Sequence, residues 1–168
     1  MSLPRGATSG WPTRSPARRR AAALGSGEVK ETEPRFEVVP VGWVESPLTE
    51  RAHAPRQGDE DAPPAWLAFE PEMADAIRDI QPGIEVLVLT WLDRARRDVL
   101  VTRPRDDPDR QPLGVFSTRS PDRPNPIGLH RVQVVAVEGS RILVHGLEAI
   151  DGTPLVDVKP VLGGVTER

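Results

Sequence analysis

The sequence predicts a mainly β domain, closed or nearly closed into a single-sheet barrel, with one short helix. Short runs rich in β-branched and aromatic residues recur along the chain and are separated by turn signals. Only one segment has helical periodicity. No GxGxxG loop follows a strand and no GKS or GKT motif occurs, so the doubly wound nucleotide-binding fold is not supported.

The 168 residues suit a single domain with a basic N-terminal arm. Residues 1–35 mix Pro, Gly, Ser and Arg, and their seven basic and three acidic residues leave a net charge of +4. We expect a disordered arm, either a dispensable leader or a segment that contacts RNA phosphates through its arginines. These are Arg14, Arg18, Arg19 and Arg20. Residues 36–168 are expected to form the domain, and their net charge of −7 argues against nonspecific nucleic-acid binding.

Several classes of protein are disfavoured by composition. The chain has no cysteine, and its three histidines are dispersed, which predicts no metal site. His53 and His145 are expected to be structural or exposed to solvent. No apolar run approaches the roughly 18 residues of a membrane span, and the N-terminus lacks the apolar core of a secretory signal. A cytoplasmic protein is therefore expected.

The first half of the domain contains the predicted helix. Residues 36–44 are predicted to form a strand, which Pro40 confines to an edge or a bulge. Residues 48–64 are polar and aperiodic, as in a long loop. Residues 70–80 have Pro71 in the first turn and the helical spacing of Met73, Ile77 and Ile80, so they predict a helix.

The second half contains more strands. Residues 84–92 predict a strand buried on both faces, residues 98–102 a short strand, and residues 103–112 a charged loop. Residues 129–137 and 141–149 flank Glu138-Gly139-Ser140, which predicts a hairpin. A turn at 150–155 and a last strand at 156–162 follow. We expect Trp43, Trp66 and Trp91 to lie in the core.

The longest motif, which we call the central motif, is LGVFSTRSPDRPNPIGLHRV at residues 113–132. An apolar run leads into a loop that holds Arg119, Asp122, Arg123 and Asn125 between three prolines. Because proline fixes φ and Asp and Asn hydrogen-bond nearby backbone, this loop should adopt one shape. Its guanidinium groups suit an anionic ligand.

Three segments in fixed order carry a resemblance. Gly114–Val132, with HAPRQG at 53–58 and DGTPLVDVKP at 151–160, resembles the TsaA-like family, also called the TrmO or tRNA (adenine-N6)-methyltransferase family. The resemblance covers about residues 38–162. It implies a β-barrel that binds S-adenosylmethionine unlike the Rossmann methyltransferases, often at a homodimer interface. Members of known activity methylate N6 of a threonylcarbamoyl-bearing adenosine beside the anticodon of threonine tRNAs. This chain resembles a short form without the C-terminal domain of many bacterial members.

The same resemblance implies a set of site residues. The implied cofactor-binding residues are Pro55, Arg56, Gln57, Asp93, Arg94, Arg103, Asp151, Gly152, Thr153 and Pro154. The implied catalytic or substrate-side residues are Arg119, Arg123 and Asn125. Methyl transfer from a sulfonium is an in-line displacement, so such residues need only hold and align the two reactants. Each also has a purely structural interpretation, such as a turn at Asp151-Gly152, a bridge from Arg119 to Asp122 or a loop staple at Asn125.

Two other functions stay open. The net negative charge of residues 36–168 favours a methyltransferase of the same fold that acts on a small molecule or another RNA. Asp93 and Val161, which differ from the family pattern, favour a noncatalytic barrel that binds a ligand or RNA.

Overall fold

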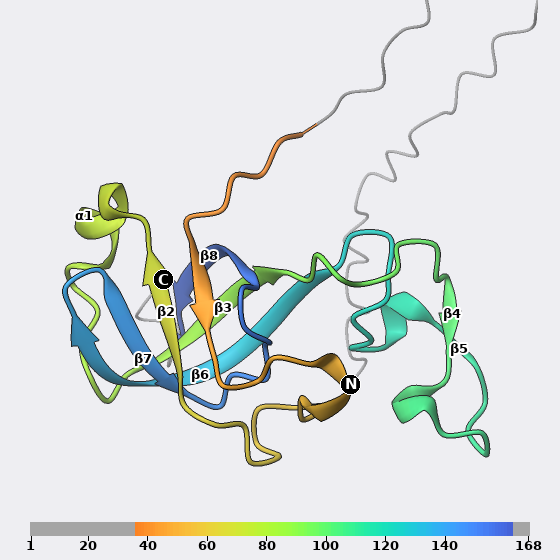
Figure 1. The fold of residues 1–168 in the computed structure, drawn as a ribbon. Coiled ribbons are helices and arrows are strands. Elements are labelled where there is room, and N and C mark those ends of the chain that lie inside the picture. The colour runs from red at the N-terminus through yellow and green to blue at the C-terminus, as the bar shows by residue number, and fades with distance from the viewer. Residues whose placement is uncertain (1–35, 163–168) are drawn as a thin grey trace, which may run out of the picture. The chain divides into compact units, whose positions relative to one another are not determined.

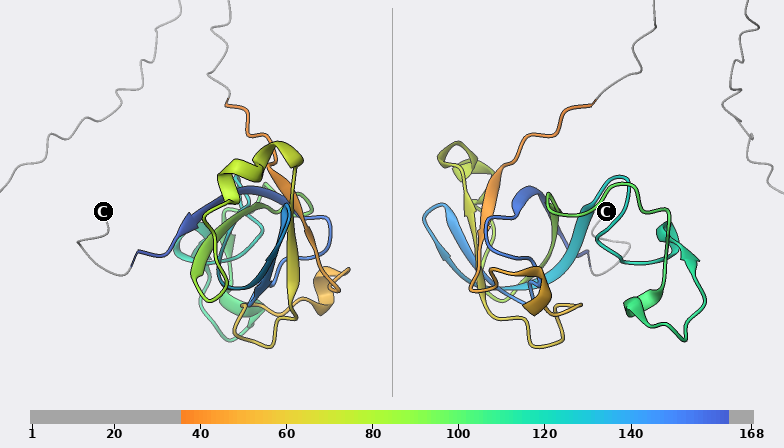
Figure 2. Two further views of the ribbon diagram at one scale, coloured as in Figure 1. Left: turned by 90° about the vertical axis from the view of Figure 1, so that its left-hand side faces the viewer. Right: turned by 45° about the vertical axis from the view of Figure 1, so that its right-hand side comes forward.

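The computed structural model describes residues 36–162, in which six antiparallel strands close into a barrel (Figure 1; Figure 2, left). The strand order around the barrel is β1-β2-β7-β6-β3-β8. The strands are β1 Gly42–Glu45, β2 Ala65–Phe69, β3 Glu85–Trp91, β6 Ile127–Glu138, β7 Arg141–His145 and β8 Pro154–Pro160. The predicted barrel with one short helix is confirmed. The arm predicted at residues 1–35 lies outside the described residues, as do the last residues of the predicted domain.

The remaining elements are short. A two-stranded sheet of β4 (Val101–Thr102) and β5 (Leu113–Gly114) lies in the connection between β3 and β6. The 3-10 helices are η1 Arg51–His53, η2 Pro71–Met73, η3 Pro104–Asp106 and η4 Val115–Ser117, and the α-helix is α1 Ala74–Ile77. No helix in the described part of the chain is long enough and apolar enough to cross a membrane.

The core fills the barrel with alternate residues of each strand, as closure requires. On β3, Val86, Val88 and Thr90 point inward, and on β6 Val132 and Val134 do so. Leu67, Val144 and Leu155 complete the centre from the other strands. This alternation corrects the prediction that residues 84–92 are buried on both faces, because the odd-numbered residues of β3 lie on the outer surface.

Other elements differ from the predictions at their ends. β1 begins only at Gly42, since Pro40 lacks the N–H that a strand would use. The predicted helix at 70–80 shortens to η2 and the single turn of α1. Strand β2 was not predicted, because its sequence AWLAF follows a proline-rich loop and is short. The tryptophans are not core residues either: Trp43 is 41% exposed and the rings of Trp66 and Trp91 are half-buried on the outer face.

The strand pairing collects three long loops at one end of the barrel, which we call the loop end. β1, β3 and β7 end there, and β2, β6 and β8 begin there. The loops are residues 46–64, 92–126 and 146–153. The 92–126 loop closes at its base through the N–H of Leu92 and the carbonyl of Pro126, 2.8 Å apart. It projects from the barrel with β4 and β5, whereas α1 lies at the opposite end (Figure 1; Figure 2, right).

Candidate functional site

All thirteen residues that the sequence predicted for the site lie at the loop end. They come from all three loops and from the first residue of β8. Antiparallel pairing explains this, because it returns the chain to the same end after every second strand. Segments that are distant in sequence therefore become neighbours, and their side chains divide into those held within the loops and those left free.

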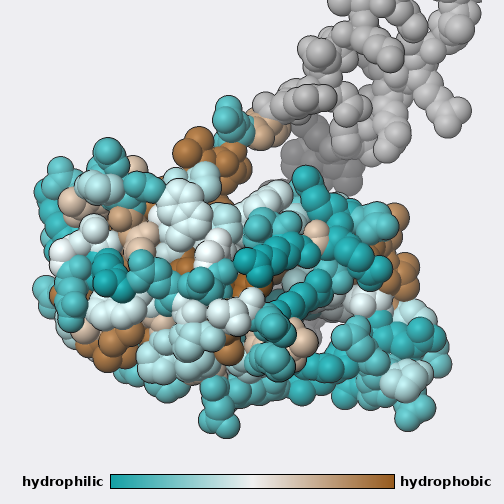
Figure 3. All heavy atoms as spheres, in the orientation of Figure 1, coloured by the Kyte–Doolittle hydropathy of each residue, from teal (hydrophilic) through white to brown (hydrophobic). Residues whose placement is uncertain are grey.

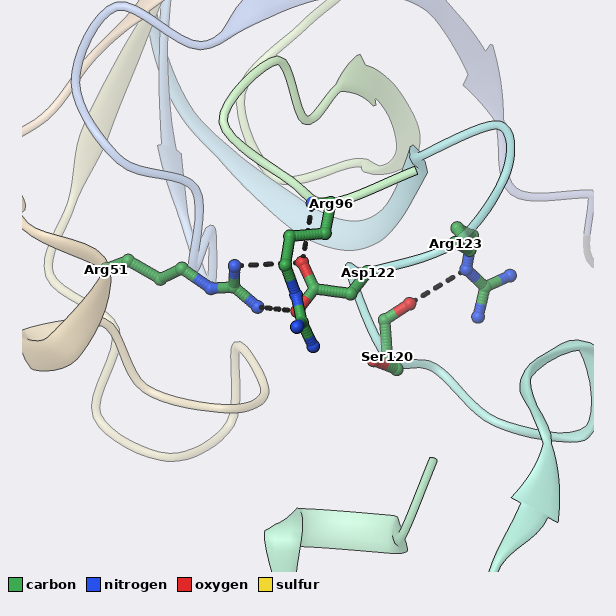
Figure 4. Close-up of polar contacts among 5 residues, drawn as sticks. All are labelled: Arg51, Arg96, Ser120, Asp122 and Arg123. Atoms are coloured by element: carbon green, nitrogen blue, oxygen red, sulfur yellow. Dashed lines mark hydrogen bonds and ion pairs between the residues drawn. The ribbon is translucent and has the colours of Figure 1, made fainter. Parts of the chain in front are cut away.

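Asp122 joins its loop to two other segments at the loop end, although it was not among the predicted site residues (Figure 4). Both oxygens of its carboxylate accept hydrogen bonds from the guanidinium of Arg51, at 2.9 and 3.0 Å. The backbone N–H of Arg96 donates to the same carboxylate at 2.9 Å. The central motif is thus tied to η1 and to the segment after β3.

The charge environment of Asp122 follows from these contacts. The hydrogen bonds from the Arg51 guanidinium hold the pKa of the Asp122 carboxyl below its usual value, although partial burial opposes the shift. The N–H and guanidinium of Arg96 lower this pKa further. No spacing in the sequence reveals the pairing, since Arg51 and Asp122 lie 71 positions apart. Only the fold brings them together.

Arg123 is committed to the shape of its own loop. Its guanidinium donates to the carbonyls of Ser120 at 2.8 Å, Thr118 at 2.5 Å and Val115 at 3.3 Å. The Thr118 hydroxyl also donates to the Val115 carbonyl at 2.9 Å. The loop of the central motif is therefore internally bonded, as a loop of one shape would be.

The other two predicted catalytic residues are exposed. The Arg119 guanidinium donates one long hydrogen bond, to the Leu129 carbonyl at 3.5 Å. Asn125 uses its backbone carbonyl to accept from the N–H of Ile127 at 2.8 Å, and its side chain faces solvent. These two side chains remain available to a ligand.

The HAPRQG segment is bound to the loop that contains Arg103. Arg56 donates its backbone N–H to the Glu60 carboxylate at 3.2 Å and its guanidinium to the carbonyl of Arg105. The Arg105 guanidinium donates to Glu60 at 2.6 Å and lowers the pKa of that carboxyl. Gly58 packs so tightly that a Cβ there would lie 1.9 Å from the carbonyl oxygen of Gly146. Pro55 and Gln57 lie on the same tethered loop.

The predicted cofactor turn at 151–154 is fixed against the end of β1. The backbone N–H of Ser46 donates to the Asp151 carboxylate at 3.0 Å, and the N–H of Gly152 donates to the Val44 carbonyl at 2.8 Å. Gly152 has a φ of +74°, which favours glycine. Thr153 is buried and its hydroxyl bonds the Ile150 carbonyl at 2.6 Å, so Pro154 starts β8 from a rigid turn.

Three charged side chains are left exposed beside these anchored loops. Within residues 36–162, Asp93 and Arg103 make no side-chain hydrogen bond or ion pair, and Arg94 donates one long hydrogen bond, to the Thr49 carbonyl at 3.5 Å. Together they offer guanidinium groups for a carboxylate or phosphate and a carboxylate for hydroxyl or ammonium groups. The described residues contain no cluster of acidic, histidine or cysteine side chains that suits a metal ion.

The domain also has hollows away from the loop end. Two apolar grooves of about 110 and 250 Å³ lie between α1 and β8, at the opposite end. Both are smaller than the roughly 300–1,000 Å³ typical of ligand pockets, and each is lined by apolar side chains and a single aspartate. The loop end, with its free charges, is the better candidate for a site.

The chain matches one family model, and it resembles curated relatives and solved structures. The family model described as the tRNA-methyltransferase O N-terminal domain matches residues 43–165. An S-adenosyl-L-methionine-binding protein of Archaeoglobus fulgidus is 42% identical over 71% of this chain and 85% of its own length. A probable S-adenosyl-L-methionine-binding protein of the same organism is 43% identical over 71% of this chain, which spans only 32% of that relative. The crystal structure of TrmO from Pseudomonas aeruginosa superposes with a TM-score of 0.63 at 27% identity, covering 83% of this chain and 62% of that one.

Proposed function

Because the chain belongs to the family of the tRNA-methyltransferase O N-terminal domain, we propose that it is an S-adenosylmethionine-dependent methyltransferase acting on tRNA. The finer proposal is methylation of N6 in threonylcarbamoyl-adenosine beside the anticodon, which would be a cytoplasmic activity. The observation that carries the proposal is the gathering of the three motif segments at the loop end. The names of the relatives in Archaeoglobus fulgidus support the cofactor.

The free side chains fit this cofactor by their chemistry. Arg94 and Arg103 suit its carboxylate, while Asp93 and the remaining lone pairs of Asp151 suit its ammonium group or ribose hydroxyls. The loops that carry these groups are tethered, so little order has to be imposed on binding. The guanidinium of Arg56 bonds the Arg105 carbonyl, so Arg56 contributes by holding the loops in their conformation.

The cofactor, when bound, supplies an electrophilic methyl group on a sulfonium. The chain needs no nucleophile, and none of its residues is asked to form a covalent bond. Arg119 and Asn125 are exposed at the central motif, where they can hold and orient an acceptor base and its neighbouring phosphate. Arg123 keeps their loop in shape. Alignment of the acceptor nitrogen is the main contribution of these residues.

The charge of the domain favours a second candidate, methyl transfer to a small molecule. Residues 36–168 have a net charge of −7, which does not suit an extended RNA surface. Assay of methyl transfer to unmodified and threonylcarbamoyl-modified threonine tRNA distinguishes the two. Transfer to neither RNA, with the cofactor bound, would favour the small molecule.

The tRNA proposal has a direct test in one pair of variants. The wild-type protein should bind S-adenosylhomocysteine in calorimetry and transfer labelled methyl to the modified tRNA. The Arg119→Ala variant should retain that affinity but lose transfer by about a hundredfold, as misalignment of an acceptor can cost. Arg78→Ala, an exposed arginine beside α1, serves as the control and should match the wild type. Unchanged transfer by Arg119→Ala would contradict the assigned role.

A homodimer is the assembly that we propose. Exposed apolar side chains lie on the 92–126 loop, where Phe116 is 79% and Leu100 65% exposed, and on the outer face of β6 at Ile127 and Leu129. Figure 3 shows hydrophobic residues at the edge formed by this loop. A second copy would cover such a surface. Light scattering should give twice the chain mass, and Phe116→Asp should give the monomer mass. A wild-type monomer at high concentration would refute the dimer.

A further inference from the structure

Two polar side chains inside the barrel and one in a neighbouring loop form a connected set next to the loop end. Thr90, the penultimate residue of β3, is fully buried, and His130 on β6 is 5% exposed. The Thr90 hydroxyl lies 2.9 Å from Nε2 of His130. Nδ1 of the same ring lies 2.8 Å from Oε1 of Glu148, in the 146–153 loop. One imidazole therefore connects two strands with a loop of the proposed site.

His130 and Glu148 are in close polar contact. Nδ1 makes no aligned hydrogen bond within the described residues, and the Glu148 carboxylate is the group that faces it at close range. Leaving a buried polar atom without a polar neighbour costs free energy, so the arrangement that keeps the carboxylate beside Nδ1 is favoured. Glu148 is thereby held at the barrel, although 23% of its side chain is exposed.

The central motif is built around the same pair. A Cβ at Gly128 would lie 2.3 Å from the Thr90 hydroxyl oxygen and 2.5 Å from Nε2 of His130. Both atoms belong to buried side chains, so a larger residue at position 128 would displace the pair. Gly128 and His130 of the central motif are thus linked, through the contact of His130 with Glu148, to the loop that leads to Asp151.

We propose that His130 is a positioning residue, which holds the 146–153 loop through Glu148 so that Asp151 and Gly152 are placed for the cofactor. This inference rests on the proposed function for the identity of the cofactor. It adds His130, which acts on the site through Glu148. The backbone bonds from Asp151 to Leu48 and from Gly152 to Val44 fix the far side of the loop. Glu148 fixes the near side.

Two substitutions separate positioning from packing. In His130→Asn the amide nitrogen occupies about the place of Nδ1 and still faces Glu148. In His130→Gln it occupies about the place of Nε2 and faces Thr90 instead. Hydrogen exchange at the amides of Asp151, Gly152 and Thr153 should quicken about tenfold in His130→Gln and stay within about twofold in His130→Asn. Affinity for S-adenosylhomocysteine in calorimetry should fall about tenfold in His130→Gln alone.

The alternative outcomes are also decisive. If amide exchange and affinity change equally in both variants, in proportion to the fall in their melting temperatures, His130 merely fills the core. That result would overturn the inference. If His130→Gln does not fold, Glu148→Gln replaces it and should quicken the same three amides. A wild-type protein that binds no S-adenosylhomocysteine would refute the proposed function, while the exchange rates, measured without cofactor, would still decide whether His130 holds the loop.

Discussion

Replacing Asp122 with alanine is expected to weaken binding of S-adenosylhomocysteine about tenfold or more. The substitution removes the acceptor shared by the Arg51 guanidinium and the Arg96 N–H, so the three segments that meet at Asp122 separate. Unfolding should become easier by about 1–2 kcal/mol, less than for a fully buried charge pair because Arg51 is half exposed. Calorimetry and urea denaturation measure the two effects.

The stability effect should depend on pH in a defined direction. The pKa of Asp122 is lower in the folded state than its ordinary value of 3.8. Its contribution is therefore fully present above that value and is lost as the pH falls through the lower, folded-state pKa. The difference in unfolding free energy between the wild type and Asp122→Ala should be constant near neutral pH and shrink below 3.8.

Asp79→Ala is the matched control for this prediction. Asp79 is an exposed carboxylate with an arginine partner at 3.4 Å, but it lies beside α1, away from the loop end. It should change neither stability nor affinity measurably. An Asp122→Ala variant that behaves like Asp79→Ala would show that the Asp122 contacts do not hold the site together.

The Gly58→Ala variant should bind the cofactor more weakly and lose methyl transfer by about a hundredfold, since a displacement of about 1 Å at a site can cost this much in rate. The new Cβ would lie 1.9 Å from the carbonyl oxygen and 2.7 Å from the carbonyl carbon of Gly146. Both atoms are backbone, so the HAPRQG segment must move away from the 146–153 loop. The melting temperature should fall only slightly, because Gly58 lies outside the core cluster.

Gly114→Ala provides the matched control, because a Cβ at Gly114 meets no atom within 4 Å. This variant should bind S-adenosylhomocysteine like the wild type. Wild-type affinity in Gly58→Ala, or equal losses in both glycine variants, would show that the contact between Gly58 and Gly146 does not shape the site.

The local parts of the fold were predictable from the sequence. The hairpin at Glu138-Gly139-Ser140 and strand β3 follow from turn chemistry and apolar patterning, and the barrel class follows from their repetition. The helix at 70–80 was predicted too long, because apolar spacing does not reveal how few turns pack on the barrel. Strand β2 was missed because a run of five residues beside prolines gives a weak pattern.

The site was predictable in its location but not in its connections. The three motifs indicate which loops matter, and the fold places them at one end. The bond from Arg51 to Asp122 and the contact from His130 to Glu148 depend on strand order and register, which no local pattern records. The sequence also could not indicate that Arg123 bonds its own loop while Arg119 remains exposed, because both arginines lie in one loop and only its backbone conformation distinguishes them.

The cofactor is expected to bind at the loop end. Titration of ¹⁵N-labelled protein with S-adenosylhomocysteine, followed by amide chemical shifts, tests it most directly. The expected result is that shifts concentrate in residues 51–61, 92–126 and 146–154, while α1 and the turn at 139–140 stay unchanged. Shifts concentrated at α1 and the end of β8, where the apolar grooves lie, would contradict it.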